Sequence, residues 1–347
     1  GQAAPPELRR HVRSPAAVIR LPAHAADEAV ATLGGETMGT TWSVRLAAAR
    51  NTDLHALHAG IQARLDRVVT QMSTWDATSD ISVYNRANAG AWQRIPDKFH
   101  RVLTCAVQIA EASDGAFDPT IGSLVGLWGF GADAAIDRAP SSTEREVARG
   151  HVGWRRIEIR GDELLQPGGL RLDLSAIAKG FGADCVVDYL RAAGISGALV
   201  EVGGELHGIG RKPDGTPWRV LVEAGAEEID HSLEPRVLAL DGVAVATSGD
   251  RWHHYTRRDE HGDEHRYTHT IDPRSGMPVE HAPVAVSVIA RDAMHADAWA
   301  TALTVLGENA GLALAERHGL AVRYLGHDGD GRLRERMTDA FRAHLAQ

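Results

Sequence analysis

Apolar residues recur at the spacing of an amphipathic helix in one early stretch of this chain. Between Leu54 and Met72 they fall three or four positions apart, at Leu57, Ile61 and Leu65, which places them on one face of a helix. Further helices are predicted at Phe99–Ala112, at Ile177–Ala193, closed by Gly194, and at Ala293–Leu306, closed by Gly307.

Short alternating or continuous apolar runs predict strands between these helices. They lie at Thr41–Leu46, Arg156–Ile159, Gly169–Leu174, Ala198–Val202, Trp218–Glu223, Arg236–Leu240, Val243–Thr247 and Val284–Ala290. The apolar stretch Ile121–Gly131 is interrupted by glycine and is predicted to be a buried loop. Because meander-like strands dominate the second half, the pattern favours a mixed α+β fold over a doubly wound parallel sheet.

The first residues differ from the rest of the chain. Residues 1–31 are rich in Ala, Pro, Arg and His and have no clear periodicity, so we expect an N-terminal arm or tether there. Folded structure is expected from Thr32 onwards. Without a repeat, a low-complexity tract or a clean linker, residues 32–347 are predicted to form one compact two-lobed unit.

Composition excludes several classes of protein. The net charge of −9 and the absence of clustered Lys and Arg argue against a nucleic-acid binder. Two cysteines, Cys105 and Cys185, are too few for a disulfide framework or a thiolate metal cage, so we expect free buried thiols. No run reaches the roughly 18 apolar residues of a membrane helix. The sequence starts at Gly1 with no signal peptide and no leading cysteine, and we expect that any export signal or lipid anchor has been cut away or never existed.

Two segments carry the candidate chemistry. Asp173 and Lys179 stand six positions apart at a predicted strand-to-helix junction, and Asp297 and Thr301 stand at i and i+4 on one face of a predicted helix. Oxygen groups set around a lysine suit a hard cation that holds a phosphate. The backbone carbonyl near Ala176 would face the same cation. This pattern indicates an enzyme that handles a pyrophosphate-containing molecule with magnesium.

Each of these residues also has a structural explanation. Asp297 could be an acid favoured by the helix dipole, and Thr301 could bond back to its own helix. Asp173 could form a salt bridge with Lys179. Trp75 either caps the core or stacks on a planar ligand. Ser248, in the segment from Ala246 to Asp250 that ends a strand, either helps to cradle phosphate or belongs to a simple turn.

Histidines crowd one later segment, which raises the question of a zinc site. The polarity of residues 259–264 instead predicts an exposed hairpin tip for His261 and His265. His269 differs because a turn-forming sequence, Ile271–Gly276, follows it and would fix it near the wall of a site. The remaining members of the segment are His253 and His254.

Taken in order, the motifs resemble those of the ApbE family of bacterial flavin transferases, which move FMN from FAD onto a threonine or serine of a target protein. They are Gly35–Thr40, Met72–Trp75, Asp114–Pro119, Asp173–Gly180, Val202–Glu205, Thr247–Asp250, His269–Pro273 with Gly276, and Ala296–Thr301. The position of Trp75 is often tyrosine in the family, which keeps a stacking ring. The family fold is a mixed α/β architecture called T-fold-like.

The resemblance implies a set of ligand contacts. It implies an FAD site lined by Met38, Trp75, Ala116, Phe117, Asp118, Asp173, Lys179 and Ile271. It implies Mg²⁺ held by the carbonyl of Ala176, the carboxylate of Asp297 and the hydroxyl of Thr301. His269 matches a family histidine near the reaction centre. A base must deprotonate the acceptor hydroxyl, and of the candidates His269 and Asp297 we favour His269, since imidazole titrates near neutral pH.

The resemblance also implies partners and a place of action. The acceptor in the family is often a subunit of a membrane redox complex or an associated flavoprotein. We therefore expect action in the bacterial cell envelope, on the periplasmic side, with an inner-membrane anchor if the precursor carries a lipobox. Two alternatives stay open: an FAD diphosphatase that releases FMN and AMP, and a binding protein that stores or senses FAD.

Overall fold

The computed structural model describes residues 18–20, 28–132, 138–222, 233–249, 254–280 and 282–345. Glu223, Asp250 and His253 of the segments discussed above lie outside these ranges, as does most of the predicted arm. Within them, β2 begins at Glu28 rather than at Thr32, and a short strand at Val18–Arg20 pairs with it. Regular structure thus starts earlier than expected, and the division at residue 31 stays a prediction.

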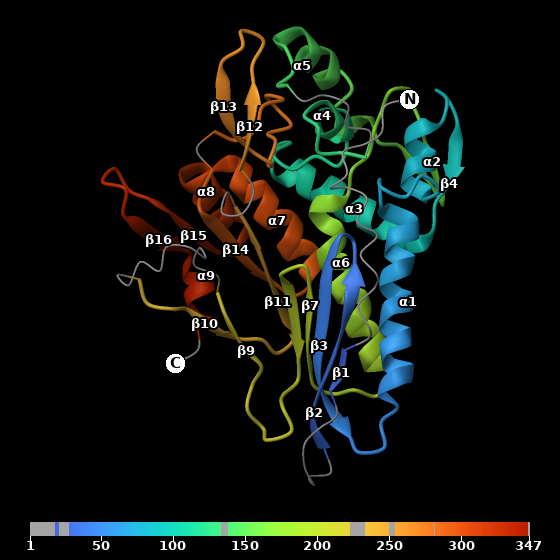
Figure 1. Ribbon diagram of the computed structural model, residues 1–347, viewed down its shortest axis with the longest axis vertical. Coiled ribbons are helices and arrows are strands. Elements are labelled where there is room, and N and C mark those ends of the chain that lie inside the picture. The colour runs from blue at the N-terminus through green and yellow to red at the C-terminus, as the bar shows by residue number, and fades with distance from the viewer. Residues whose placement is uncertain are drawn as a thin grey trace.

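A nine-stranded sheet in the order β1-β2-β3-β7-β8-β11-β14-β15-β16 forms the centre of the molecule (Figure 1). Its neighbouring strands pair antiparallel. The strands are β1 Val18–Arg20, β2 Glu28–Thr37, β3 Thr40–Ala49, β7 Ala198–Val202, β8 Glu205–Ile209, β11 Val243–Ser248, β14 Ala285–Ala290, β15 Ala321–His327 and β16 Leu333–Met337.

Three smaller ladders stand outside this sheet. One joins β4, β6 and β5, a second pairs β9 with β10, and a third is the β12–β13 hairpin. Their bounds are β4 Trp92–Arg94, β5 Ile159–Arg160, β6 Glu163–Leu165, β9 Arg219–Leu221, β10 Val237–Ala239, β12 His254–Arg258 and β13 Glu264–Thr268. The hairpin exposes His261 and His265 at and beside its tip, which confirms that prediction.

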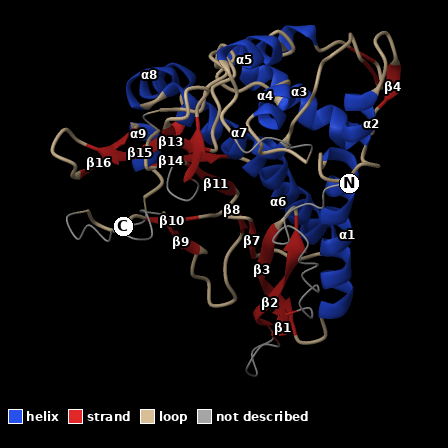
Figure 2. Cartoon of the chain, turned by 45° about the horizontal axis from the view of Figure 1, so that its top comes forward, coloured by secondary structure: helices blue, strands red, loops and turns tan. Residues whose placement is uncertain are grey.

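Helices cover one face of the main sheet, and the β9–β10 pair with α9 covers the other (Figure 2). The helices are α1 Leu54–Met72, α2 Asp80–Arg86, α3 Asp97–Ala112, α4 Gly122–Leu127, α5 Ser142–Arg149, α6 Ser175–Ala192, α7 Ala293–Leu306, α8 Glu308–His318 and α9 Asp339–Arg342, with a 3-10 turn at Trp154–Arg156. Alternate residues of the central strands enter opposite cores, as Ala244 and Val245 do. The mixed α+β fold class is confirmed.

Two element predictions are wrong, for different reasons. The stretch predicted as a buried loop contains α4, where Gly122 lowers helix propensity but permits close packing: a Cβ there would lie 2.8 Å from the carbonyl oxygen of Arg171. Gly169–Leu174 is not a strand. Its backbone groups find other partners, because Leu172 N donates to the Asn85 side chain and Asp173 N donates to the carbonyl of Pro119.

The strand predicted at Arg156–Ile159 is displaced, since the 3-10 turn occupies its first residue and β5 begins at Ile159. Cys105 and Cys185 are free and buried, in α3 and α6, as expected. Among the helices of the described residues, none combines the length and apolar character needed to span a membrane.

Candidate functional site

The close crossing of α6 and α7 is the frame of the candidate site. At Gly180 the two helices approach so closely that a Cβ would lie 2.1 Å from the carbonyl oxygen of Ala293 and 2.8 Å from the Cβ of Asp297. Only glycine fits there. The Gly180 N–H donates to Asp297 Oδ2 at 2.9 Å. The crossing therefore brings the segment with Lys179 next to the segment with Asp297.

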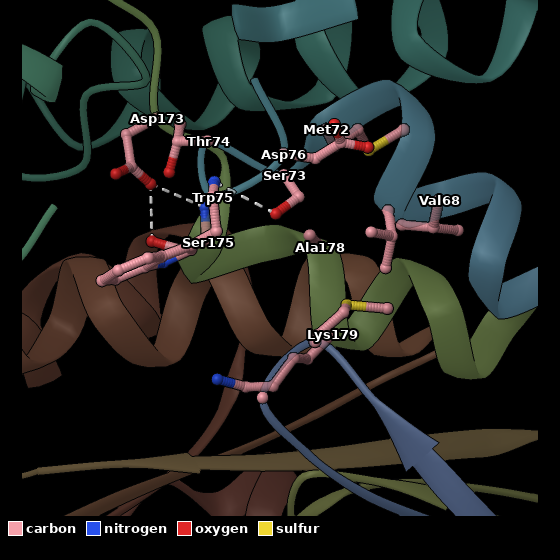
Figure 3. A pocket seen from close by; sticks show the side chains of 13 residues that line it. Val68, Met72, Ser73, Thr74, Trp75, Asp76, Asp173, Ser175, Ala178 and Lys179 are labelled. Carbon is pink, nitrogen blue, oxygen red and sulfur yellow. Dashed lines mark hydrogen bonds between the residues drawn. The ribbon is translucent and has the colours of Figure 1, made fainter. Parts of the chain in front are cut away.

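Two cavities adjoin at this crossing and share Ser175 and Lys179 as walls. The larger, about 470 Å³, is mostly apolar and is lined by Met38, Val68, Met72, Trp75 and Ala178, with Asp173 at its edge (Figure 3). The smaller, about 290 Å³, is lined by oxygen-bearing and polar groups that include Ala176, Ser248, His269, Asp297 and Thr301. The structure thus gathers most of the residues singled out in the sequence around one lysine.

Met38 reaches the larger cavity from a strained turn. It joins β2 to β3 with a φ of 49°, in the left-handed region that side chains other than glycine seldom adopt, and Gly39 follows at 71°. Its methyl group packs against Gly182, where a Cβ would lie only 2.8 Å away. Such strain costs about 1–3 kcal/mol and is typical of residues that line ligand sites.

Asp173 and Lys179 form no ion pair in the described part of the chain. Asp173 Oδ1 instead accepts hydrogen bonds from the backbone N–H and the hydroxyl of Ser175, and Oδ2 accepts none from the described residues. The Lys179 side chain runs across Gly203, where a Cβ would lie 2.7 Å from its Cδ, and in Figure 3 its amine lies below the α6 ribbon while Asp173 lies above it. One carboxylate oxygen and the amine are therefore both available to a ligand.

Asp297 and Thr301 face the smaller cavity from α7, which begins at Ala293. Burial raises the pKa of Asp297 to about 7, although Lys179 and the bond from Gly180 oppose this shift. Thr304 donates to the carbonyl of Ala300 within its own helix, whereas Thr301 makes no such bond among the described residues. A buried carboxylate and a free hydroxyl one turn apart are a fitting pair of ligands for a hard cation.

Ala176 adds a third oxygen. In a regular α-helix the Gly180 N–H donates to the carbonyl of Ala176. Here the same N–H donates to Asp297 Oδ2. A carbonyl oxygen has two lone pairs, so that of Ala176 can face a cation in the smaller cavity it lines. Within the described residues, no group of three or more His, Cys, Asp or Glu is placed to hold a metal.

His269 stands at the exposed rim of the smaller cavity. Its ring lies 4.7 Å from that of Phe130 and 5.1 Å from that of Tyr255, measured between centroids. Aromatic neighbours on two sides restrict the orientation of the imidazole. A side chain of another protein can reach a residue in this exposed position.

Four residues that the resemblance implies for the FAD site line neither of these two cavities. Ala116 and Phe117 are buried in the core, and Ile271 packs in a separate cluster with Trp128. Asp118 lines a third cavity, and Oδ1 accepts from the N–H and hydroxyl of Thr120. Burial raises the pKa of Asp118, and these bonds oppose the shift. Their contacts with FAD stay predictions.

Some lining residues were not assigned to the site from the sequence, although two of them, Met72 and Glu205, stand in the family motifs. Val68 and Met72 form part of the larger cavity, although their helical spacing indicated only core packing. Glu205 lines the smaller cavity just after the Gly203–Gly204 turn. The sequence feature that could have indicated Glu205 as a site residue is its position directly after a glycine pair that ends a strand.

Known proteins are similar to this chain in sequence. A family model described as the ApbE family matches residues 38–324. The FAD:protein FMN transferase of Vibrio cholerae is 34% identical over 317 residues, 91% of this chain and 92% of that protein. The FAD:protein FMN transferase of Escherichia coli K12 is 31% identical over 321 residues, 91% and 89% of the two chains.

Solved structures agree. The apo form of the flavinyl transferase ApbE from Pseudomonas stutzeri superposes with a TM-score of 0.84 at 37% identity, covering 93% of this chain and 98% of that one. The flavin transferase ApbE from Vibrio cholerae gives 0.83 at 34% identity, covering 92% and 100%. The names of these relatives confirm the predicted transferase class. Because the family model and the relatives span most of its length, this chain belongs to the ApbE family.

Proposed function

We propose that this chain is a magnesium-dependent FAD:protein FMN transferase, which joins FMN from FAD to a threonine or serine of a target flavoprotein through a phosphoester bond and releases AMP. One observation carries the proposal. An apolar cavity of about 470 Å³ and an oxygen-lined cavity of about 290 Å³ adjoin, and Lys179 lines both of them. The first suits a planar ring, and the second suits a pyrophosphate with its cation.

Binding is divided between the two cavities. Trp75 and Met38 offer an indole face and a thioether to a ring of FAD, while the free oxygen of Asp173 accepts from a ligand hydroxyl or ring N–H. Lys179 stands between the cavities, where its charge meets the phosphates. Asp297, Thr301 and the carbonyl of Ala176 would hold Mg²⁺, which when bound neutralises charge on the pyrophosphate. We expect FAD to bind more tightly than FMN, because FMN lacks that pyrophosphate.

The transfer step needs an acceptor hydroxyl at the rim of the smaller cavity. Its oxygen attacks the FMN-side phosphorus, a new P–O ester bond forms, and the bond from that phosphorus to the bridging oxygen breaks. AMP leaves with the bridging oxygen and its electron pair. His269 accepts the hydroxyl proton as the bond forms, and Lys179 offsets the charge that develops on the phosphates.

A product assay tests this function against its two alternatives. The protein is incubated with FAD, MgCl₂ and a threonine-containing peptide taken from a flavinylated protein. A covalently yellow peptide with AMP supports transfer, free FMN with AMP indicates a diphosphatase, and unchanged FAD indicates a storage or sensing protein. The exposed rim position of His269 favours transfer, because a protein side chain can reach it.

The place of action is a proposal that rests on the resemblance. We propose the periplasmic side of the bacterial cell envelope, with an acceptor that is a subunit of a membrane redox complex, and an inner-membrane anchor if the precursor carries a lipobox. Fractionation of cells that express the complete gene tests it. Transfer activity confined to the cytosolic fraction would contradict it.

A further inference from the structure

We propose that Asp184 is a positioning residue for the oxygen-lined cavity: its buried carboxylate ties α6 to the first turn of α7 and thereby fixes Asp297 and Thr301 relative to Lys179. This inference rests on the proposed function, because Asp297 and Thr301 are the metal ligands assigned there. Asp184 itself lines neither cavity among the described residues, so its effect must pass through the helix it holds.

The carboxylate of Asp184 bridges the two helices at short distances. Oδ1 accepts the N–H of Ala293 at 2.8 Å, and Oδ2 accepts the N–H of Met294 at 2.9 Å. These are the first two residues of α7, whose N–H groups have no partner within the helix. Asp184, on α6, thus accepts with both carboxylate oxygens from the N–H groups at the start of a different helix, α7.

The contacts of Asp184 and Gly180 act together. The two residues stand one turn apart on α6 and so share one face of that helix. Gly180 donates to Asp297, one turn into α7, while Asp184 accepts from Ala293 at the start of α7. Contacts at two successive turns set both the distance and the rotation of α7 against α6.

A third contact connects the carboxylate to the sheet. Nδ1 of His207, on β8, donates to Asp184 Oδ1 at 2.8 Å, and the two side chains are only 5% and 10% exposed. The same carboxylate therefore links α6, α7 and the central sheet. A site whose ligands come from α6 and α7 gains a fixed frame from such a link.

Stability alone is a poor explanation for this arrangement. Removing a carboxylate from water is costly, and apolar residues of similar volume often stabilise a core as well or better. The start of α7 already has a local cap, since Asp292 accepts the N–H of His295 at 2.8 Å. A second carboxylate supplied by the neighbouring helix adds what the local cap cannot, which is the placement of α7 relative to α6.

The test compares two variants, each of which removes one carboxylate that accepts hydrogen bonds from the start of α7. Asp184→Ala removes the link between helices, whereas Asp292→Ala removes the local cap and leaves the link in place. Mn²⁺ is titrated into each FAD-saturated protein, and free Mn²⁺ is followed by electron paramagnetic resonance. Thermal unfolding is recorded in parallel, and Asp188→Ala, which removes an exposed carboxylate one turn further along α6, serves as the charge control.

We expect Asp184→Ala to weaken Mn²⁺ binding at least about 10-fold, as is typical when groups that orient metal ligands are removed. Asp292→Ala and Asp188→Ala should stay within about 2-fold of wild type, and FAD affinity without metal should change little in all three. If Asp184→Ala does not fold, Asp184→Asn keeps the volume and one acceptor oxygen and should show a smaller loss of the same kind.

Two results would overturn the inference: Mn²⁺ affinity unchanged in both Asp184 variants, or an equal loss in Asp292→Ala, which would reduce Asp184 to a stabilising cap. The proposed function is judged separately by the product assay. A wild-type protein that binds Mn²⁺ but transfers no FMN contradicts the proposed function and leaves the positioning role in place.

Discussion

The two cavities that meet at Lys179 differ in what lines them and in how firmly their walls are held. The larger is walled by apolar side chains from the end of α1, the β2–β3 turn and the loop that follows α1, where Trp75 is 65% exposed. The smaller is walled by oxygen-bearing groups, and its carboxylate, Asp297, is only 6% exposed. Apolar contact adds affinity in proportion to buried area, whereas fixed charges act where charge develops in a reaction.

This difference assigns separable tasks to the two walls. Changes in the apolar cavity should alter the affinity for FAD and leave turnover nearly intact. Changes in the oxygen-lined cavity should slow turnover by a larger factor than they weaken FAD binding, because groups that meet charge developing in the transition state contribute more there than in the ground state. Variants of this cavity in which turnover and FAD affinity fall by the same factor would contradict the division.

The largest effect is expected for His269→Ala. Removal of a general base lowers a rate by about 10²–10⁴-fold, so FMN transfer to a threonine peptide should fall by that order while FAD affinity, measured by calorimetry, hardly changes. His265→Ala removes an exposed histidine of the neighbouring hairpin and should be neutral. A proportional loss of FAD affinity would make His269 a wall of the binding site and move the role of base to Asp297.

A slightly smaller effect is expected for the assigned metal ligands. Asp297→Ala and Thr301→Val should each slow magnesium-dependent transfer by about 10²–10³-fold, the usual result of removing one group that stabilises transition-state charge. The matched control is Thr304→Val, because Thr304 lies on the same helix and already bonds to Ala300. Full activity in Asp297→Ala, or equal losses at positions 301 and 304, would end the metal assignment.

The apolar cavity should respond more weakly. Trp75→Ala should reduce FAD affinity about 10-fold, because a stacked aromatic pair contributes about 0.5–1.5 kcal/mol beyond its buried area. The rate at saturating FAD should stay within about 2-fold of wild type, as a uniform binding contact predicts. Trp75→Tyr keeps a ring and should bind nearly as well. A large loss of rate in Trp75→Ala with unchanged affinity would reverse the roles of the two cavities.

The sequence predicted the helices that carry the site closely, because α1 has a regular apolar repeat and because a glycine follows α6 and α7 closely. The predicted bounds Leu54–Met72 and Ala293–Leu306 are those of α1 and α7. Sequence patterns failed where the backbone bonds to side chains and distant loops instead of to a neighbouring strand. The backbone of Gly169–Leu174 bonds to Asn85 and to a distant loop, and no pattern within six residues can reveal such partners.

The site was only partly accessible from the sequence for a related reason. Asp173, Lys179, Asp297 and Thr301 were found because acids, amines and hydroxyls are conspicuous in apolar segments, and the structure brings them to adjoining cavities. The contacts that frame the site involve Gly180 and Asp184. Their meaning depends on where α7 crosses α6, which is set by the packing of the whole fold rather than by either segment.

The smallest effect on activity is expected for a region that touches neither cavity. Glu335 on β16 accepts from Arg236 at 2.6 Å and from Arg323 at 2.6 Å, and its side chain is 9% exposed. Burial alone would raise the pKa of Glu335, but these hydrogen bonds and charges lower it below its usual value. A lowered folded-state pKa contributes stability above the pKa of the unfolded chain, and that stability is lost as the pH falls through the folded value.

Glu335→Gln should therefore lower the free energy of unfolding by about 3 kcal/mol at pH 7, because it removes the buried carboxylate charge that pairs with the guanidinium groups of Arg236 and Arg323. The difference from wild type, measured by urea unfolding, should shrink as the pH falls from the ordinary glutamate pKa, about 4.3, through the lower folded-state pKa of Glu335. FAD affinity and transfer rate at pH 7 should not change. A fall in either would show that the sheet edge at β15 and β16 communicates with the cavities, and the division of tasks would then extend beyond their walls. An equal stability difference at pH 7 and pH 3 would show instead that the shape of the side chain, and not its charge, holds this edge.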